Sequence, residues 1–327
     1  MKVKILIIQT SFPGDVILAT ALPETLRRCF PEAELHFLVR KGNESLLQGH
    51  PFLHNVWIWD KKRKWSSALE LVRAFRREKF DRVVNVQRFF MTGLMTILSG
   101  APDRRGFDKN PLSFLYTKKV PHVFQEGLHE VQRNQLLIAD LCGTEPELPR
   151  LYPPAMTLPT DKPYIVLAPA SVWFTKQWPE AYWSELADIL DTELDIVLSG
   201  GPADRALCER IEKATRRPLI NTCGQYSLLQ SAGIIQGARA IVCNDSAPAH
   251  LATAVNTPTV QIYCSTDTRF GFSALASPHI LLETPEPLSC RPCTTHGREA
   301  CPLGHFLCGK NVTPALVAKA VTELLKA

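Results

Sequence analysis

Short apolar runs alternate with amphipathic segments along most of the chain, a pattern that predicts β-strands separated by α-helices. In the first half, the apolar runs predict strands at residues 3–8, 35–39, 56–59 and 82–86. Apolar residues at helical spacing predict helices at residues 16–29, 65–78, 90–98 and 127–141. Residues 104–125 lack steady periodicity and are expected to form a long irregular loop, which in a compact domain usually serves function.

The alternation resumes in the second half, after a Pro- and Gly-rich linker at residues 143–162. Strands are expected at residues 164–168, 195–198, 218–221, 240–244 and 259–263. Helices are expected at residues 179–190, 202–214, 227–235 and 313–326, with another beginning near Pro248. Repeated strand–helix units form parallel sheets, so the predicted fold is α/β with two Rossmann-like lobes facing a central cleft. The predicted domains are residues 1–157 and 158–327; an alternative packs the terminal helix back on the first lobe.

A strand–turn–helix–strand unit at residues 240–263 is the most informative stretch. Asp245 and Ser246 follow an apolar run, and Pro248 then opens a helix that carries His250. Free backbone N–H groups and the positive end of a helix at such a turn suit a phosphate. The alternative is that Asp245 and Ser246 simply cap the helix. The chain contains neither a Walker loop nor GxGxxG, so an anion here would be held by a capping turn.

Three further turns carry candidate chemistry, because ligands of open α/β sheets bind at the carboxyl ends of strands. Asp15 follows the first strand and is either a proton acceptor or a helix N-cap. Lys176, in the turn that begins near Ser171, offers a point charge to a diphosphate, although a lone lysine is normally just solvated. Asp204 follows another strand and would either accept a ribose hydroxyl or cap the next helix.

Composition describes a water-soluble globular chain that is only mildly basic. It has 327 residues, 45% hydrophobic and 21% charged, with a net charge of +5. Its first apolar segment is too short for a signal peptide and no run is long enough to span a membrane, so a cytosolic protein is expected. The basic cluster from Lys61 to Lys64 suits an anionic membrane surface or acceptor, the alternative being a solvated helix entry. Aromatic residues are not interleaved with it, which argues against nucleic acid.

The ten cysteines fall into two groups. Six are scattered and are expected to be small buried hydrophobes of a reduced compartment: Cys29, Cys142, Cys208, Cys223, Cys243 and Cys264. The others, Cys290, Cys293, Cys301 and Cys308, lie close together with His296 and His305. Their density is that of a zinc site but their spacing is not that of a standard finger or ribbon, so a structural clasp is expected, with zinc as one option.

Several motifs, taken in order, resemble those of the ADP-heptose:lipopolysaccharide heptosyltransferases, glycosyltransferase family 9. Residues 11–16 resemble T-S-x-x-G-D-x-[IVL], and Lys176 to Pro179 match K-x-W-P. Residues 245–259 resemble D-[ST]-G-x-x-H-L-x-A-A-x-x-x-P-T, with Ala247 in the place of Gly. The cysteine cluster resembles a C-x-P-C…C-P-[LF]-G-H-x-x-C pattern of some members. His129 and Arg133 match an H-x-x-x-R-N helix, where a buried structural pair is expected.

The resemblance implies GT-B architecture, with Asp15 as the general base. It implies a donor site made of Ser171, Thr175, Lys176, Asp204, Asp245, Ser246, Ala247 and His250. Basic residues of the first half would contact the acceptor, namely Lys61, Lys64, Arg104 and Arg105.

The expected function is an inverting transfer of heptose from ADP-L-glycero-D-manno-heptose to a lipid-linked, anionic inner-core lipopolysaccharide acceptor, with no cofactor required. Such an enzyme would be cytoplasmic and peripheral on the inner membrane. Alternatives are a family member with another nucleotide sugar or acceptor, a non-catalytic nucleotide-sugar-binding protein, and an NAD-dependent oxidoreductase.

Overall fold

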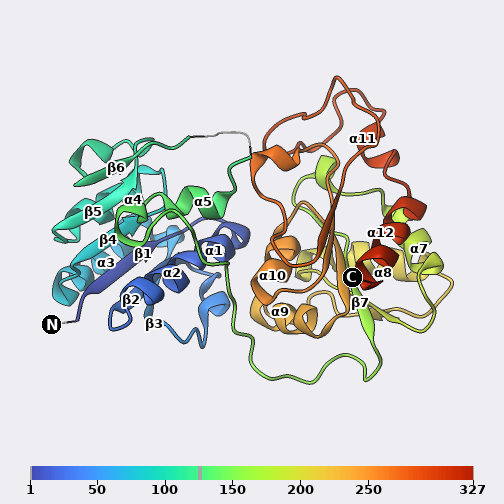
Figure 1. Ribbon diagram of the computed structural model, residues 1–327, viewed down its shortest axis with the longest axis horizontal. Helices are drawn as coiled ribbons and strands as arrows, with labels where there is room; N and C mark the ends of the chain where they lie inside the picture. Colours follow the sequence, from blue (N-terminus) through green and yellow to red (C-terminus); the bar gives the residue numbers. More distant parts are fainter. Residues whose placement is uncertain (1, 124–126, 327) are drawn as a thin grey trace. The chain divides into compact units, whose positions relative to one another are not determined.

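The computed structural model describes residues 2–123 and 127–326, which divide into two compact units, Met1–Tyr152 and Pro153–Ala327 (Figure 1). Each unit holds one six-stranded sheet in which all strands pair in parallel. The border between the units lies in the Pro-rich linker, five residues before the border expected at residues 157 and 158. This is the α/β fold that the alternating pattern predicts.

The first unit has the strand order β3-β2-β1-β4-β5-β6. Its strands are β1 (Lys4–Ile8), β2 (Glu34–Arg40), β3 (Leu53–Trp59), β4 (Arg82–Asn85), β5 (Asp103–Phe107) and β6 (Lys118–Val120). Its helices are α1 (Pro13–Ala19), α2 (Ala21–Cys29), α3 (Lys64–Glu78), α4 (Phe90–Leu98), α5 (Glu130–Gln135) and α6 (Ala139–Cys142). Apolar residues of α3 and α4 pack on one face of the sheet, while α1 contacts both α2 and α5.

The second unit has the strand order β12-β11-β10-β7-β8-β9. Its strands are β7 (Tyr164–Ala168), β8 (Asp195–Leu198), β9 (Ile220–Asn221), β10 (Ala240–Asn244), β11 (Thr259–Ile262) and β12 (His279–Leu282). Its helices are α7 (Glu180–Ile189), α8 (Arg205–Ala214), α9 (Leu228–Gly237), α10 (Ala247–Val255), α11 (Leu307–Lys310) and α12 (Pro314–Lys326). The helices α7, α8 and α12 pack on one face, and α9 packs beside α10 (Figure 1).

The central strands of the second unit show why the apolar runs are such clear signals. Every residue of β7 and of β10 is buried, as expected for parallel strands covered by helices on both faces. The terminal helix α12 packs against α7 and strands β10, β11 and β12 of its own unit, with Pro314 at its first position.

Several predicted elements of the first unit were wrong. Residues 104–125, expected to be an irregular loop, include most of β5 and all of β6; residues 124 and 125 lie outside the described residues. The sequence of β5 is DRRGF, and its three charged residues do not give the apolar pattern by which a strand is predicted. In the structure β5 pairs with β4 on one side and with β6 on the other. The helix expected at residues 16–29 begins at Pro13 and is divided at Thr20, and the one expected at residues 127–141 is two short helices.

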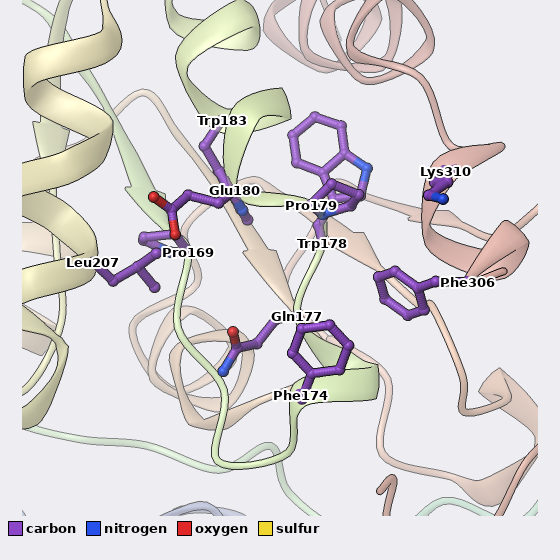
Figure 2. Close-up of a pocket in the computed structure, with 10 residues that line it drawn as sticks. All are labelled: Pro169, Phe174, Gln177, Trp178, Pro179, Glu180, Trp183, Leu207, Phe306 and Lys310. Carbon is purple, nitrogen blue, oxygen red and sulfur yellow. The ribbon is translucent and has the colours of Figure 1, made fainter. Parts of the chain in front are cut away.

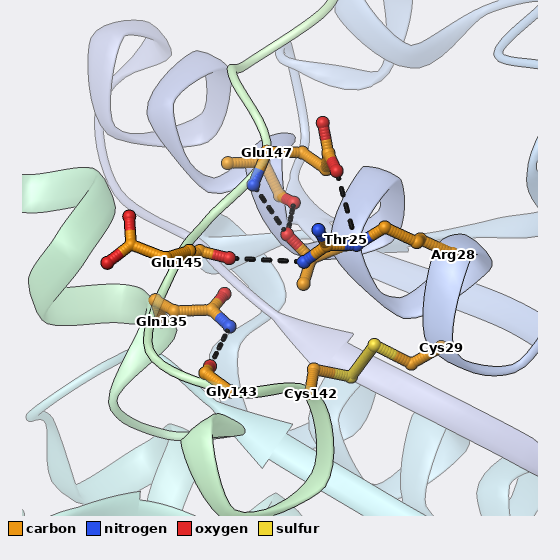
Figure 3. The surroundings of a disulfide bond; sticks show 9 residues. Thr25, Arg28, Cys29, Gln135, Cys142, Gly143, Glu145 and Glu147 are labelled. Carbon is orange, nitrogen blue, oxygen red and sulfur yellow. Dashed lines mark hydrogen bonds and ion pairs between the residues drawn. A yellow bond between two sulfur atoms is a disulfide. The ribbon is translucent and has the colours of Figure 1, made fainter.

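Four of the six scattered cysteines are paired, which corrects the expectation that all six are free. Cys29 at the end of α2 is bonded to Cys142 at the end of α6 (Figure 3), and Cys208 is bonded to Cys223. Cys243 and Cys264 are buried and unpaired within the described part of the chain, as expected. The first pair is 113 residues apart in sequence, so only the packing of α2 against α6 brings it together.

Candidate active site

In each sheet the strand order reverses beside the first strand of the unit, and the turns at that point carry the candidate residues. In the second unit the reversal lies between β7 and β10, and in the first unit between β1 and β4. Crevices outside the carboxyl ends of strands at such a reversal are the usual ligand sites of open α/β sheets. Asp15 follows β1, Lys176 follows β7, and Asp245 follows β10.

A buried ion pair joins the two turns of the second unit. The Lys176 Nζ lies 2.7 Å from Asp245 Oδ2, and both side chains are largely shielded from water. The Thr266 hydroxyl donates to the same oxygen at 2.7 Å. Asp245 therefore aims the lysine ammonium at the turn that precedes α10.

The start of α10 is held without the expected cap. Ser246 is the N-cap residue, but within the described chain its side chain makes no capping hydrogen bond. Its hydroxyl donates instead to the Ala170 carbonyl at 3.2 Å. The interpretation that Asp245 and Ser246 simply cap the helix is therefore wrong, since Asp245 binds Lys176. In the first turn Pro248 has no N–H and the Ala249 N–H donates to the Ser246 carbonyl at 3.0 Å, so the Ser246 and Ala247 N–H groups are the ones that could bind an anion.

The turn after β7 is fixed by the strand beside it. The Asn244 side chain donates to the Pro169 carbonyl at 2.7 Å and accepts from the Trp178 N–H at 2.9 Å. Thr175 is buried, and its hydroxyl meets the Ser265 hydroxyl at 2.9 Å. These bonds clamp both ends of the segment that carries Lys176.

The other predicted donor residues lie at the same edge with different roles. The Ser171 carbonyl accepts a hydrogen bond from the Gln177 amide at 2.6 Å, and His250 is buried in α10. Asp204 Oδ2 accepts from the Gly201 N–H at 2.8 Å, so of its two predicted roles the structure shows a local turn cap. Its contact with a ribose stays a prediction.

A cavity of about 210 Å³ lies beside this site but is not the predicted one (Figure 2). Its described lining includes Phe174 and Gln177, the neighbours of Thr175 and Lys176, and none of the predicted site residues. Phe174 and Phe306 both line it, and the centroids of their rings lie 5.5 Å apart.

In the first unit Asp15 sits inside the first turn of α1, where Phe12 is the N-cap residue. The alternative role of Asp15 as the N-cap is therefore wrong. Burial raises the pKa of Asp15 above its ordinary value, opposed by the backbone hydrogen bond of Phe12 and by the charges of Arg88 and Arg40. A carboxylate with raised proton affinity at a strand end is suited to accept a proton.

Arg40, Arg88 and Glu130 were missed by the sequence reasoning. Arg40 ends β2 and Arg88 follows β4, the two strands that flank β1. The Arg40 guanidinium lies 4.9 Å from the Phe12 ring centroid. The signal existed, because both arginines stand at the carboxyl ends of predicted strands, the position that singled out Asp15.

Glu130 reaches the same cluster from α5, which packs beside α1 (Figure 1). Its carboxylate lies 2.8 Å from the buried Arg133 guanidinium. Burial raises the pKa of Glu130, the Arg133 charge lowers it, and the charge of Asp15 raises it further. The two carboxylates therefore interact electrostatically. Among the described residues Arg133 is ion-paired with Glu130, and the His129 side chain caps α5.

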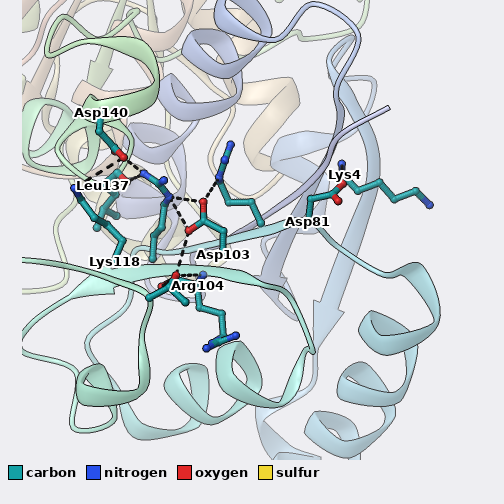
Figure 4. A network of polar contacts seen from close by, with 10 residues as sticks. Lys4, Asp81, Asp103, Arg104, Lys118, Leu137 and Asp140 are labelled. Atoms are coloured by element: carbon teal, nitrogen blue, oxygen red, sulfur yellow. Dashed lines mark hydrogen bonds and ion pairs between the residues drawn. The ribbon is translucent and has the colours of Figure 1, made fainter. Parts of the chain in front are cut away.

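The four predicted basic residues do not form one surface. Lys61 and Lys64 follow β3 at one edge of the sheet, whereas Arg104 and Arg105 lie on β5, beyond β2, β1 and β4. Arg105 is buried and ion-paired with both Asp103 and Asp140. Figure 4 shows these two carboxylates in their network of polar contacts. This pairing gives Arg105 a structural role and corrects its assignment to the acceptor.

The cysteine cluster contains thiols, which are suitable zinc ligands, but their separation in the structure is not that of a zinc site. Two thiolates on one zinc lie at most about 4.6 Å apart, because each Zn–S bond is about 2.3 Å. Among the described residues, no three of these thiol and imidazole groups come within 4.8 Å of one another. Slight burial acts against ionisation of Cys301, yet backbone N–H groups led by that of Phe306 lower its pKa overall.

One other group of ligand type, Glu34, His36 and His54, does meet the 4.8 Å spacing in the described chain. The Trp57 indole donates to His36 Nδ1 at 3.1 Å. A metal-bound histidine uses its second nitrogen as a donor, so this arrangement does not fit a cation. The Lys4 ammonium, 3.5 Å from Glu34, already neutralises the carboxylate.

Comparison with known proteins points to one family. Residues 68–295, more than half of the chain, match the model of glycosyltransferase family 9 (heptosyltransferase). Lipopolysaccharide heptosyltransferase 3 of Escherichia coli is 27% identical over 279 residues, covering 78% of this chain and 82% of that protein. The structure of E. coli ADP-heptose lipopolysaccharide heptosyltransferase II aligns with a TM-score of 0.81 at 21% identity, over 100% of this chain and 99% of that one. The E. coli heptosyltransferase WaaC with ADP aligns with a TM-score of 0.76 at 20% identity, over 98% and 99%.

Proposed function

The chain belongs to glycosyltransferase family 9, the heptosyltransferases, and from that membership we propose that it transfers heptose from ADP-L-glycero-D-manno-heptose to an inner-core sugar of lipopolysaccharide with inversion. The two α/β units have the fold of the solved heptosyltransferases. Membership in an enzyme family sets aside the two alternatives of another class, the oxidoreductase and the non-catalytic binding protein.

The Lys176–Asp245 pair beside the start of α10 is the observation that supports the donor assignment. It holds the Lys176 ammonium against Asp245, the residue that precedes the Ser246 N-cap of α10, at the carboxyl ends of the strands. That combination suits the diphosphate of a nucleotide sugar. The solved structure of E. coli heptosyltransferase WaaC, which has the same fold, is one with ADP. In this proposal Ser246 and Ala247 contribute N–H groups, and Asp245 acts by orienting Lys176.

The proposed reaction is a single displacement. The Asp15 carboxylate takes the proton of the acceptor hydroxyl as its oxygen forms a bond to the anomeric carbon. The bond from that carbon to the phosphate oxygen breaks on the opposite side, so the configuration inverts and ADP leaves with the electron pair. Lys176 and the N–H groups of Ser246 and Ala247 stabilise the charge that develops on the diphosphate. No step uses a cofactor.

The acceptor is proposed to bind the first unit through its anionic groups. Arg40 and Arg88, which act electrostatically on Asp15, are better placed for this than Arg104 on β5. Lys61 and Lys64, both exposed after β3, suit an anionic membrane surface. Among the described residues no helix is both long and apolar enough to cross a bilayer. We propose a peripheral enzyme on the cytoplasmic face of the inner membrane.

Transfer from ADP-heptose to heptose-deficient core oligosaccharides tests the proposal. We expect ADP release that depends on the acceptor, and among nucleotide sugars the largest thermal shift with ADP-heptose. Nuclear magnetic resonance of the product should show the inverted anomeric linkage. Stabilisation by a uridine or guanosine sugar instead, with no transfer from ADP-heptose, would rule out the proposed donor.

The pH dependence of transfer should report the carboxylate pair in the first unit. Asp15 must be ionised to accept a proton, so activity is lost as the pH falls through its raised pKa. The charge of Asp15 raises the pKa of Glu130, so the two carboxyl groups are coupled; Glu130→Gln removes that coupling, and we expect the acid limb of the kcat/KM profile to move to lower pH.

Glu24→Gln is the matched control for that profile. Glu24 is another buried carboxyl of the first unit with a raised pKa. It accepts a hydrogen bond from the Tyr152 hydroxyl at 2.9 Å, and Asp15 is not among the groups that shift its pKa. Its variant should keep the parent profile. An acid limb that stays in place or moves to higher pH in Glu130→Gln would contradict the coupling between Glu130 and Asp15.

A further inference from the structure

The cysteine-rich segment folds directly onto the turn that carries Lys176. The Thr175 N–H donates to the Arg298 carbonyl at 3.1 Å, and the Arg298 N–H donates back to the Thr175 hydroxyl at 2.8 Å. This reciprocal pair joins residues 123 positions apart in sequence. The segment between Cys293 and Cys301 is therefore attached to the residue next to the diphosphate-binding lysine.

A second set of bonds, made by Ser265 shortly after β11, supports the same junction. The Ser265 N–H donates to the Thr175 carbonyl at 3.2 Å, and the Cys293 N–H donates to the Ser265 carbonyl at 3.0 Å. Ser265 thus connects the cysteine-rich segment with the Lys176 turn. Because Thr266 is the next residue and binds Asp245, the junction also reaches the partner of the lysine.

Gly297 is the point where this segment meets the lysine side chain. A Cβ atom at Gly297 would lie 2.9 Å from Lys176 Cγ, 3.1 Å from its Cδ and 2.9 Å from Trp173 Cβ. The Gly297 φ angle is +90°, and the Thr294 hydroxyl accepts the Gly297 N–H at 2.8 Å and donates to its carbonyl at 3.1 Å. The backbone of a closed turn is therefore packed against the stem of Lys176.

We propose that Gly297 is a positioning residue for donor binding: its bare backbone forms the wall that keeps the Lys176 stem directed at Asp245 and the diphosphate. This inference rests on the proposed function and deepens it by giving the cysteine-rich segment a role in the donor site. Its physical basis is that a lysine stem has several rotatable bonds. A wall on one side and a carboxylate at the tip select one of its conformations, which reduces the entropy lost when the diphosphate binds.

Gly297→Ala tests the wall, with Gly304→Ala as its matched control. Gly304 belongs to the same segment and also has a positive φ, +69°, but a Cβ there meets no described atom within 4 Å. Both variants place alanine at a positive φ and so strain the backbone, but only the Cβ of Gly297→Ala would collide with the Lys176 side chain. We expect the Kd for ADP and the KM for the donor to rise about tenfold or more in Gly297→Ala, with the acceptor KM unchanged. Gly304→Ala should match the parent.

The position of Lys176 can be followed without any substrate. Reductive methylation with ¹³C-formaldehyde labels each lysine, and the Lys176 signal is assigned by its absence from Lys176→Arg. We expect that signal to be shifted by Asp245 in the parent and in Gly304→Ala, and to move towards the exposed lysines in Gly297→Ala. Thr175→Val, which removes the hydroxyl that accepts from the Arg298 N–H and from the Ser265 hydroxyl without adding bulk, should move it in the same direction if Gly297→Ala does not fold.

The two readouts separate this inference from the proposed function. If the parent binds no ADP but Gly297→Ala moves the Lys176 signal, the positioning role of Gly297 is supported and the donor assignment fails. If the parent binds ADP and Gly297→Ala binds it within twofold with an unchanged Lys176 signal, the wall is refuted. Equal losses in Gly297→Ala and Gly304→Ala would also refute it, because backbone strain would then explain both.

Discussion

Asp15→Asn is expected to lower the turnover of heptose transfer by about 10²–10⁴-fold, the usual contribution of a general base. Asparagine keeps the size of the side chain but cannot accept the proton of the acceptor hydroxyl. The same variant should unfold at a higher temperature than the parent at neutral pH. A protein that is more stable yet inactive would show that the loss is chemical and does not come from misfolding.

The stability half of this prediction follows from the direction of the pKa shift. Burial raises the pKa of Asp15 in the folded state above its value in the unfolded chain. The contribution of this carboxyl to stability is therefore fully present below the unfolded pKa and is lost as the pH rises through the folded pKa. At neutral pH the ionised side chain opposes folding, and asparagine removes that opposition.

Asp81→Asn is the control for this experiment. Asp81 precedes β4 in the same unit and therefore lies at the amino ends of the strands, whereas Asp15 lies at their carboxyl ends. Its carboxylate accepts the Lys4 N–H at 2.7 Å. Its variant should transfer heptose at the parent rate. Turnover of Asp15→Asn within threefold of the parent would remove Asp15 from the role of base.

Lys176→Met is expected to lower kcat/KM for the donor by about 10²–10³-fold, the loss seen when one preorganised donor to developing negative charge is removed. It should also destabilise the fold, because Asp245 is left as a buried charge whose one remaining side-chain partner in the described parts of the chain is the Thr266 hydroxyl. Breaking a buried ion pair in this way typically costs about 3–5 kcal/mol, and the remaining hydrogen bond should reduce that cost. Chemical denaturation and titration with ADP measure the two effects.

The double variant Lys176→Met/Asp245→Asn separates binding from stability. Removing both charges should restore most of the free energy of unfolding, because no buried charge remains without its partner. ADP affinity should stay low, since the ammonium is still absent. Lys213→Met, at an exposed lysine of α8, should leave both quantities unchanged. Recovery of ADP binding in the double variant would mean that Asp245, and not Lys176, governs the donor site.

Local pattern was sufficient for most of the fold and for the two residues on which these predictions depend. The strands at β1, β7 and β10 are apolar runs, and burial on both faces of a parallel sheet is what makes them so. Asp15 and Lys176 could be selected because a residue at the carboxyl end of such a strand can be located by counting along the chain. Strand β5 was not predicted because it contains charged residues, and the partner that allows Asp103 to lie in a strand, Arg82, is distant in sequence.

The sequence by itself thus determined the order of strands and helices, the division into two α/β units, and the turns where chemistry could occur, since each of these depends on residues that are close together in the chain. Only the tertiary structure decided which charges meet. It paired Lys176 with Asp245, paired Arg105 with Asp140, and brought Glu130 to the neighbourhood of Asp15. It also attached the cysteine-rich segment to Thr175. These contacts join residues far apart in sequence, and their geometry arises only when the sheets and helices pack.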